Sequence, residues 1–368
     1  MIRKKNYINI VAIFFFLLGC TGIKSPKNIT GDTLTATDLH PFGRALPTNG
    51  KLELISSAVH FGFTFEGNEC SVFASIPNLY GHNYLQYELD GKYQKRIRID
   101  GSSDQPIILE ADGEGKHTVW IYKATEAHTG PVLIDKIIAG KIKSIQKPNL
   151  PLIEFIGNSI ACGACADVSE VPCGAGEYHD QHNAYYAYGP RVARALGTNF
   201  IISGVSGIGI YRTWNKDGPA MPEVYGKTDF QIQSSRLWNF NLYDPKIVSI
   251  ELGTNDLGDG DGRNIRLPFD SSIFVNTFIK FIQLVKSKYP ETQIALLSSP
   301  VVNGNRRIIL QNCLTVIKAN INRLYKNDKP VALYFFKPMQ GTGCTGHPSV
   351  GDHAILAEEL IPFFKKLL

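Results

Sequence analysis

The sequence predicts two domains: an all-β domain, and after it an α/β domain whose parallel sheet is covered by helices. Residues 41–146 consist of short runs in which apolar and polar side chains alternate, separated by turn residues. From residue 152 onward, short apolar runs alternate with helical stretches instead. With 368 residues the chain has room for about two domains. We place them at 41–147 and 148–368. The boundary lies just before Pro148, the first of two closely spaced prolines.

The first residues have the pattern of an export signal. A basic group, 3–5, precedes an apolar stretch, 8–18, that is too short to span a bilayer comfortably. The ending L-L-G-C resembles a bacterial lipobox, in which the cysteine, here Cys20, carries the lipid. We therefore expect a signal peptide over 1–20 and a flexible tether over 21–40. The protein would be exported and lipid-anchored to a bacterial membrane, on its periplasmic side or at the cell surface; a plain secretory signal is the alternative.

The composition is typical of a soluble globular protein. Hydrophobic residues make up 43% of the chain, charged residues 19%, and the formal net charge is +5. Three of these surplus positive charges lie at 3–5, so the remainder is close to neutral. We expect no nucleic-acid partner, because proteins that bind nucleic acids usually have a strongly basic surface. We also expect a monomer.

Several alternating runs predict the strands of the first domain. In the run 57–65 apolar side chains occupy every second position, and the runs 95–99 and 118–122 repeat this pattern. The run 85–89 is followed by Asp-Gly at 90–91, a strong signal for a hairpin turn. No helical stripe of useful length interrupts these runs. They predict a β-sandwich or jelly roll.

The second domain is predicted as strands that alternate with helices. Short apolar strands joined by helices imply a parallel sheet covered on both faces. The expected strands are 152–156, 200–202, 247–252, 294–298 and 331–336. The expected helices are 184–196, 271–289, 306–325 and 350–367. In such sheets ligands bind beyond the carboxyl ends of the strands, so each strand end is a place to look for chemistry.

Four strand ends carry groups that acyl transfer needs. The first is followed by Ser159, the second by Gly207, the third by Asn255 and the fifth by His347. They offer in turn a nucleophile, a backbone amide, a carboxamide and a base. Each has an ordinary structural alternative: a helix cap, a tight turn, an Asx turn and a loop histidine. Four such residues at four strand ends favour an active site.

The set resembles a known superfamily. G-N-S-I, S-G-I-G, G-T-N-D and H-P-S occur in this order, as in the SGNH (GDSL-type) hydrolases. Longer matches, including N-A-Y-Y-A-Y-G at 183–189 and G-C-T-G-H-P-S at 343–349, are similar to carbohydrate esterase family 2. The segment I-Y-K-A-T-E-A at 121–127 resembles the jelly-roll domain of that family. The resemblance implies a jelly roll followed by a flavodoxin-like three-layer hydrolase domain.

The resemblance also implies an activity. Family 2 esterases remove acetyl groups from polysaccharides such as acetylated xylan and glucomannan, without a metal or organic cofactor. On the matching positions Ser159 would be the nucleophile and His347 the general base. The amides of Ser159 and Gly207 and the side chain of Asn255 would form the oxyanion hole. The alternatives are an esterase for another acyl carrier, such as a cell-wall glycan or a lipid-like ester, and a carbohydrate-binding protein with a vestigial catalytic domain.

One residue departs from the wider superfamily. SGNH hydrolases usually carry an acid three residues before the base, and here Cys344 occupies that position. A thiol cannot replace a carboxylate as the group that orients the histidine. We expect a Ser–His dyad in which a backbone carbonyl from the segment before His347 does so. An aspartate from elsewhere, such as Asp167 or Asp180, is the alternative.

The cysteines suit an exported protein with disulfides. We expect a Cys162–Cys344 bridge between the nucleophile and base loops, and a Cys165–Cys173 bridge within the intervening loop. A zinc site built from the same loop cysteines with nearby histidines is a less favoured alternative. Cys70 and Cys313 are expected to be buried as apolar residues.

Three residues near the second and third strand ends have less specific roles. Tyr211 and Trp214 are candidates for a sugar-stacking platform, or equally for hydrophobic anchors of their loop. Asp256 follows the oxyanion asparagine and is expected to fix the loop rather than to react.

Overall fold

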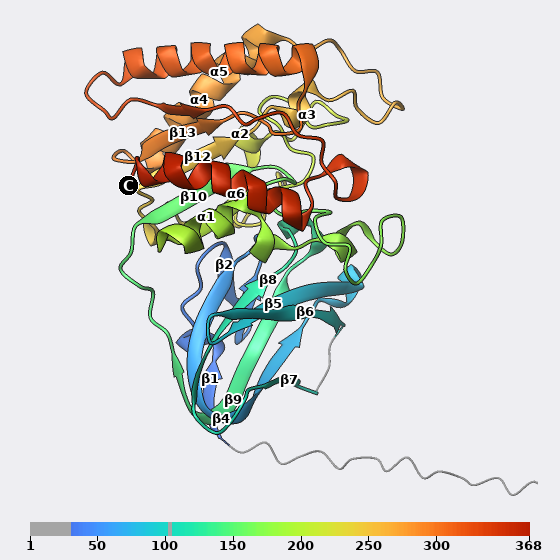
Figure 1. Ribbon diagram of the computed structural model, residues 1–368, viewed down its shortest axis with the longest axis vertical. Helices are drawn as coiled ribbons and strands as arrows, with labels where there is room; N and C mark the ends of the chain where they lie inside the picture. The colour runs from blue at the N-terminus through green and yellow to red at the C-terminus, as the bar shows by residue number, and fades with distance from the viewer. Residues whose placement is uncertain (1–30, 102–104) are drawn as a thin grey trace, which may run out of the picture.

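The computed structural model describes residues 31–101 and 105–368, which form two domains stacked along the long axis of the molecule (Figure 1). The predicted signal peptide and Cys20 lie outside the described residues. None of the helices in the described part of the chain combines the length and apolar character that a membrane crossing needs.

The first domain, called the β domain below, is all-β as predicted. Its strands pair antiparallel in one sheet, along the order β2-β3-β9-β4-β8-β5-β6, with β1 on β9 and β7 on β4. The strands are β1 (Asp32–Thr35), β2 (Ala45–Thr48), β3 (Lys51–Leu54), β4 (His60–Ser75), β5 (His82–Leu89), β6 (Lys92–Asp100), β7 (Ile107–Glu110), β8 (Lys116–Lys123) and β9 (Val132–Ser144). Short 3₁₀ turns are η1 (Ala36–Asp38), η2 (Asn78–Tyr80) and η3 (Ala127–Thr129).

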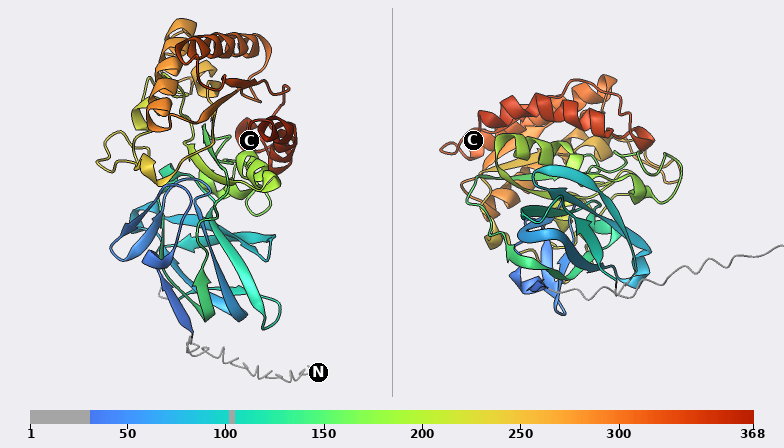
Figure 2. Two further views of the ribbon diagram at one scale, coloured as in Figure 1. Left: turned by 90° about the vertical axis from the view of Figure 1, so that its left-hand side faces the viewer. Right: turned by 60° about the horizontal axis from the view of Figure 1, so that its bottom comes forward.

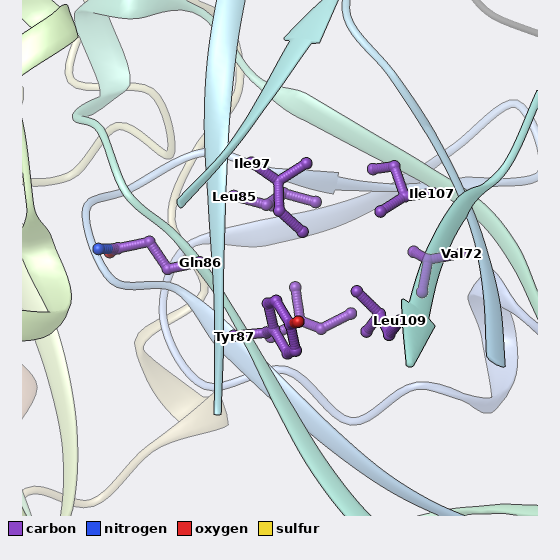
Figure 3. A pocket seen from close by; sticks show the side chains of 8 residues that line it. Val72, Leu85, Gln86, Tyr87, Ile97, Ile107 and Leu109 are labelled. Atoms are coloured by element: carbon purple, nitrogen blue, oxygen red, sulfur yellow. The ribbon is translucent and has the colours of Figure 1, made fainter. Parts of the chain in front are cut away.

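The alternation in the sequence explains how this domain packs. Val59, Phe61 and Phe63 are buried in one apolar core, as their two-residue period requires. Asp90 and Gly91 both have positive φ, the conformation of a tight hairpin turn. The core leaves a cavity of about 10 Å³, between apolar side chains of β4 to β8 (Figure 3). That is room for no more than about one water, so this core offers no ligand pocket.

One boundary was wrong. The tether was expected to extend to residue 40, but β1 pairs with β9 over Asp32–Thr35, and η1 follows directly. In this segment, between residues 32 and 40, three side chains are buried in the core: Leu34, Ala36 and Leu39. The backbone hydrogen bonds to β9, rather than an apolar pattern, place it in the sheet.

The second domain contains a five-stranded parallel sheet in the order β11-β10-β12-β13-β14. This is the 2-1-3-4-5 order of flavodoxin-like folds, and the predicted α/β class is confirmed. The strands are β10 (Leu152–Gly157), β11 (Asn199–Gly204), β12 (Ile247–Glu251), β13 (Gln293–Leu297) and β14 (Ala332–Tyr334). The helices are α1 (Tyr188–Leu196), α2 (Met221–Val224), α3 (Thr254–Leu257), α4 (Ser271–Lys288), α5 (Gly304–Leu324) and α6 (Val350–Lys365), with 3₁₀ turns η4 (Tyr178–Gln181), η5 (Ala184–Tyr186), η6 (Phe240–Leu242) and η7 (Cys344–Gly346).

Helices cover both faces of this sheet (Figure 2). On one face α4 and α5 contribute side chains such as Phe278 and Leu310 to a core that includes Ile250 of β12. On the other face α1 and α6 pack together against Phe155 of β10, with Leu360 from α6. The central strands β10, β12 and β13 are therefore buried along their whole length, which explains why each reads as a short, largely apolar run, whereas β14 at the sheet edge is only half-buried.

Buried polar contacts join the two domains. Arg44 is the residue just before β2. It is fully buried, and its guanidinium donates to the carbonyl of Tyr225 at 2.9 Å. Its guanidinium lies 4.0 Å from the ring centre of Phe230. At the edge of the same interface, Arg236 makes a 2.7 Å ion pair with Glu53 of β3. A buried cation with aromatic and carbonyl partners fixes the orientation of the domains closely.

The carboxyl ends of the central strands meet at one edge of the sheet. Gly157 of β10 is in register with Gly204 of β11 on one side and with Glu251 of β12 on the other. Because β10 is followed first by one neighbour and then by the other, this is the topological switch point of the sheet. The loops after these three strands therefore converge on one place.

Candidate active site

Ser159 and His347 are brought together across the sheet edge. Ser159 lies in the turn after β10, and its Oγ is 2.9 Å from Nε2 of His347, which follows η7. The two residues are 188 positions apart in the chain. Ser159 is 7% exposed and His347 is half-buried, so the pair is accessible from one side. This is the distance and arrangement that a serine nucleophile and its base require.

The other ring nitrogen of His347 is oriented by its own loop. Nδ1 lies 3.2 Å from the carbonyl of Cys344 and 3.0 Å from Oγ1 of Thr345. Thr345 donates its hydroxyl proton to the Cys344 carbonyl at 2.7 Å, so its oxygen accepts from Nδ1–H. With the proton on Nδ1, Nε2 is left as the acceptor for Ser159, the tautomer that a general base needs. The predicted backbone carbonyl is thus confirmed, whereas no local pattern singled out Thr345.

The two alternative aspartates do not contact this histidine. Asp167 accepts hydrogen bonds from Ser169 and from the side chain of Asn183. Asp180 accepts from Tyr84 and from the amide of Glu177. Both carboxylates are therefore engaged elsewhere, Asp167 within its own loop and Asp180 with β5 of the β domain, and the alternative is wrong.

The protein environment keeps His347 uncharged. Burial lowers the pKa of His347 below its ordinary value, and the hydrogen bond to the Cys344 carbonyl offsets this only in part. The imidazole is consequently neutral at and somewhat below neutral pH.

Gly207 is held in a conformation that favours glycine. Its φ is +77°, and a Cβ atom there would lie 2.6 Å from Cδ1 of Trp214. The amide of Trp214 donates to the Gly207 carbonyl at 2.9 Å. The turn after β11 and the indole ring therefore pack directly against each other, and any larger residue would displace one of them.

Asn255 and Asp256 tie the third strand end to the second. The carboxamide of Asn255 donates to the carbonyl of Ile208 at 2.8 Å, one residue beyond Gly207. Asp256 accepts from the amides of Ile210 and Tyr211, both at 3.0 Å. Burial raises the pKa of Asp256 to about 6, although these amide hydrogen bonds lower it. Its predicted role in fixing the loop is confirmed.

The two candidate platform residues differ in their surroundings. Trp214 is 43% exposed and lies on the Gly207 turn. The ring of Tyr211 packs against Phe269, and its hydroxyl accepts from the amide of Asp270 at 3.2 Å. Tyr211 thus makes the contacts of a loop anchor, whereas Trp214 is partly exposed beside the Gly207 turn.

Tyr178 is a site residue that the sequence did not indicate. Its ring is 6.4 Å from that of His347, edge to face, and its hydroxyl is 3.1 Å from Oγ of Ser206. It lies in η4, within an irregular loop that has no periodic pattern, so no local signal singles it out.

Comparison with known proteins identifies the chain. Residues 42–148 match the family model "Carbohydrate esterase 2 N-terminal", and residues 155–331 match that of the GDSL-like lipase/acylhydrolase family. A solved family two carbohydrate esterase from Clostridium thermocellum, in complex with cellohexaose, has a TM-score of 0.77 at 25% identity, over 89% of this chain and 98% of that one. The chain belongs to carbohydrate esterase family 2. Its predicted class, carboxylic ester hydrolase, is confirmed with its family.

The names of two curated relatives of this family 2 member also indicate esterases. The chain is 28% identical over 317 residues to "Cellulase/esterase CelE" of Acetivibrio thermocellus, and it spans 36% of the length of that protein. It is 24% identical over 363 residues to an "Acetylxylan esterase / glucomannan deacetylase" of Cellvibrio japonicus, covering 96% of each chain.

The disulfide of this family 2 esterase differs from the expected pairing. Cys173 is bonded to Cys344, whereas Cys162 and Cys165 are free and buried. Cys162 packs under the sheet edge, where its Sγ would lie 2.9 Å from a Cβ on Gly204. The thiol thus points into the sheet and away from the base loop. Cys344 is tied instead to the exposed far side of the 163–177 loop, and the predicted pairing is wrong.

The bridge should influence catalysis by this esterase through Cys344, whose carbonyl accepts from His347. Replacing Cys173 with serine should lower kcat by about 10-fold with little change in KM, since sub-ångström displacement of a base is costly. Steady-state hydrolysis of 4-nitrophenyl acetate measures this. Cys313→Ser, at a buried free thiol of α5, is the control. An unchanged kcat in the Cys173 variant would show that the bridge does not hold the base.

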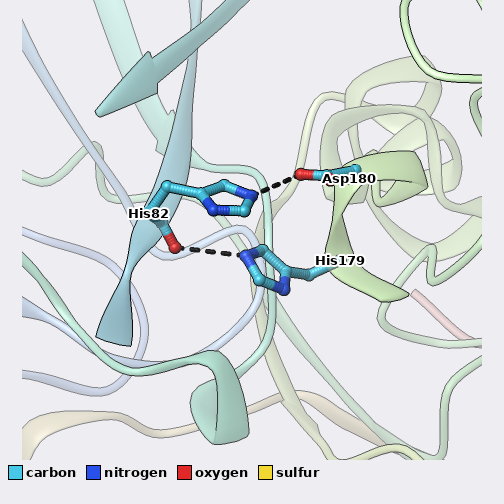
Figure 4. Close-up of side chains that lie close together, drawn as sticks. All are labelled: His82, His179 and Asp180. Atoms are coloured by element: carbon cyan, nitrogen blue, oxygen red, sulfur yellow. Dashed lines mark hydrogen bonds and ion pairs between the residues drawn. The ribbon is translucent and has the colours of Figure 1, made fainter. Parts of the chain in front are cut away.

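A histidine–aspartate cluster lies beside the site of this esterase (Figure 4). His82 of β5 contacts Oδ1 of Asp180 through Nε2 at 2.5 Å, and His179 contacts the His82 carbonyl at 3.1 Å. Tyr84 and the amide of Glu177 donate to the same carboxylate. The hydrogen bonds between His82 or Tyr84 of β5 and the residues of η4 make this cluster a contact between the two domains. The zinc site considered from the sequence used the loop cysteines instead. Cys173 cannot be one of its ligands, because it is bonded to Cys344.

Proposed function

We propose that this protein is a serine esterase that removes O-acetyl groups from polysaccharides of the acetylated xylan or glucomannan type. The observation that carries the proposal is the 2.9 Å contact between Ser159 and His347 at the switch point of a family 2 fold. The name of the Cellvibrio japonicus relative, "Acetylxylan esterase / glucomannan deacetylase", supports the substrate class. An exposed Trp214 beside the site suits a sugar ring, whose apolar face packs on aromatic rings.

The reaction begins with Ser159. Its Oγ attacks the acetyl carbonyl carbon while its proton passes to Nε2 of His347. The carbonyl oxygen becomes an oxyanion, held by the amides of Ser159 and Gly207 and by the carboxamide of Asn255. As the intermediate collapses, the C–O bond to the sugar breaks and His347 returns the proton to the sugar oxygen. The acetyl group remains on Ser159.

Water completes the cycle in the same geometry. His347 takes a proton from a water molecule, which attacks the acetyl-serine carbonyl. A second oxyanion forms in the same place, and its collapse breaks the ester bond to Ser159. The proton returns from His347 to the serine oxygen, and acetate leaves.

The Asn255 side chain should contribute to the oxyanion hole. Asn255→Ala should lower kcat by about 10²–10³ with an unchanged fold, because one charge-stabilising donor is lost. Kinetics on 4-nitrophenyl acetate together with the melting temperature measure both. Asn241→Ala, at the surface turn η6, is the control. An unchanged kcat would remove Asn255 from the oxyanion hole.

Parallel substrate assays test the function itself. Acetate release is measured from acetylated xylan, acetylated glucomannan and O-acetylated peptidoglycan. We expect release from one or both plant polysaccharides. Release from peptidoglycan alone would favour the cell-wall alternative. No release from any substrate, with intact binding to polysaccharide, would favour a vestigial domain, against which the intact Ser159–His347 contact argues.

We also propose that the protein is exported and lipid-anchored through Cys20. The basic group and the short apolar stretch before L-L-G-C support this. Cys20→Ala should move the protein out of the membrane fraction and leave an unlipidated precursor. Unaltered membrane fractionation of the variant contradicts the anchor.

A further inference from the structure

Glu126 belongs to the β domain but lies at the hydrolase site. It lies in the short segment between β8 and η3, immediately before η3, and is 1% exposed. Neither hydrogen-bond partner of its carboxylate is in the β domain. Oε2 accepts from the amide of Ser206 at 2.6 Å, and Oε1 lies 3.4 Å from Nε2 of His182. Ser206 is the residue immediately before Gly207.

The carboxylate carries its negative charge. Burial alone would raise the pKa of Glu126, but the hydrogen bonds from His182 and Ser206 lower it to about 2. His182 accepts a hydrogen bond at Nδ1 from the amide of Cys165 at 3.4 Å, so Nε2 is the ring nitrogen that donates to the carboxylate. The closer partner of the carboxylate is therefore the Ser206 amide, and the His182 ring is the more distant one.

Little positive charge lies near the Glu126 carboxylate to balance its negative charge. Lys123, fully buried in β8, donates to the backbone carbonyl of Glu126 at 2.6 Å. Burial lowers the pKa of Lys123 to about 7, so this lysine is only partly charged at neutral pH. The titratable groups that Glu126 faces are Lys123, His128, Cys162, Cys165, Tyr178 and His182. Burial raises the pKa values of those thiols and of the phenol, which keeps them neutral.

Two ring contacts connect the carboxylate to the catalytic base: the ring of His182 lies 4.8 Å from that of Tyr178, which lies 6.4 Å from that of His347. After burial and the Cys344 carbonyl, the nearby groups that affect the pKa of His347 are His182, which lowers it, and Glu126, which raises it by a smaller amount. The base becomes an imidazolium as it removes the serine proton. A fixed negative charge stabilises that imidazolium, which is part of what the orienting acid does in a Ser-His-Asp triad. Here the acid's position is taken by Cys344.

We propose that Glu126 is a positioning residue of the esterase site, which anchors the Ser206–Gly207 turn and supplies the negative charge near His347 that the position of Cys344 lacks. The proposal rests on the proposed function. It gives the β domain a part in organising the site, since the carboxylate that holds the Ser206 amide comes from this domain and not from the hydrolase domain.

Glu126→Gln tests the charge, because the amide keeps the shape of the side chain. We expect kcat for 4-nitrophenyl acetate to fall by about 10- to 100-fold, less than the loss of about 10⁴ for a directly bonded acid. KM should change little. The acidic limb of the kcat/KM profile should move to lower pH, because removing a negative charge lowers the pKa of His347.

Two further variants separate this role from a structural one. Glu53→Gln breaks the interdomain ion pair with Arg236 without touching the site. It should lower the melting temperature and leave kcat and the pH profile unchanged. Glu126→Asp keeps the charge but withdraws it from Ser206. It should lower kcat while leaving the acidic limb near its wild-type position, and it carries the test if the glutamine variant does not fold.

The outcomes distinguish the two proposals. An inactive wild-type protein overturns the proposed function. An active wild type with wild-type kcat and pH profile in Glu126→Gln, or with full kcat in Glu126→Asp, overturns the role of Glu126. A lower kcat in Glu126→Gln without a displaced acidic limb also overturns it, because the residue would then be structural only.

Discussion

Ser159→Ala should reduce kcat for 4-nitrophenyl acetate by about 10⁴–10⁶, equivalent to about 5–8 kcal/mol of transition-state stabilisation. The reason is that Oγ forms the bond to the acetyl carbon, and a methyl group cannot. The residual rate would come from the oxyanion donors and from binding, which act without the nucleophile. The substitution removes one oxygen from a nearly buried side chain, so we expect the fold to persist.

Controls distinguish a lost nucleophile from a damaged site. Ser169→Ala, at an exposed loop serine bonded to Asp167, should retain wild-type kcat. An acetylated Ser159 peptide should be detected after rapid quenching of the wild type and be absent from the Ser159 variant. Activity of the Ser159 variant within about 10-fold of wild type would assign the nucleophile elsewhere.

Local patterns explain how much of this architecture could be predicted. The two-residue alternation around Phe61 and the apolar run of β10 each reflect burial, on one face or on two, and burial is recorded in the sequence itself. The strand ends were predictable for the same reason, because the glycine that stops β10 precedes Ser159. Once the sheet is parallel, these ends must meet at one edge.

Features that depend on loop paths could not be predicted. Cys344 pairs with Cys173 because the 163–177 loop returns over the base, and cysteine spacing carries no information about that path. Thr345 orients His347 through a left-handed backbone, with φ of +54°, that nothing in its residue type requires. Glu126 is a single acidic residue at a strand end, and only the docking of the two domains places it against Ser206.

His347→Ala should abolish turnover to the same extent, about 10⁴–10⁶, because Ser159 then has no proton acceptor. The variant also leaves a space where the half-buried ring was. Added imidazole should therefore restore part of the activity, whereas it should not rescue Ser159→Ala. His40→Ala, in the β domain where the ring contacts Gln146, is the control and should keep full activity.

The pH dependence of the wild type tests the state of this base. Only the neutral imidazole accepts the serine proton, so protonation at low pH removes activity. Burial lowers the pKa of His347, so the acidic limb of kcat/KM should lie below the ordinary value of about 6.5. An aspartate bonded at Nδ1 would instead raise the pKa of His347 and move the acidic limb to higher pH. A limb above 7, or one that persists in His347→Ala, would contradict a Ser–His dyad oriented by the Cys344 carbonyl.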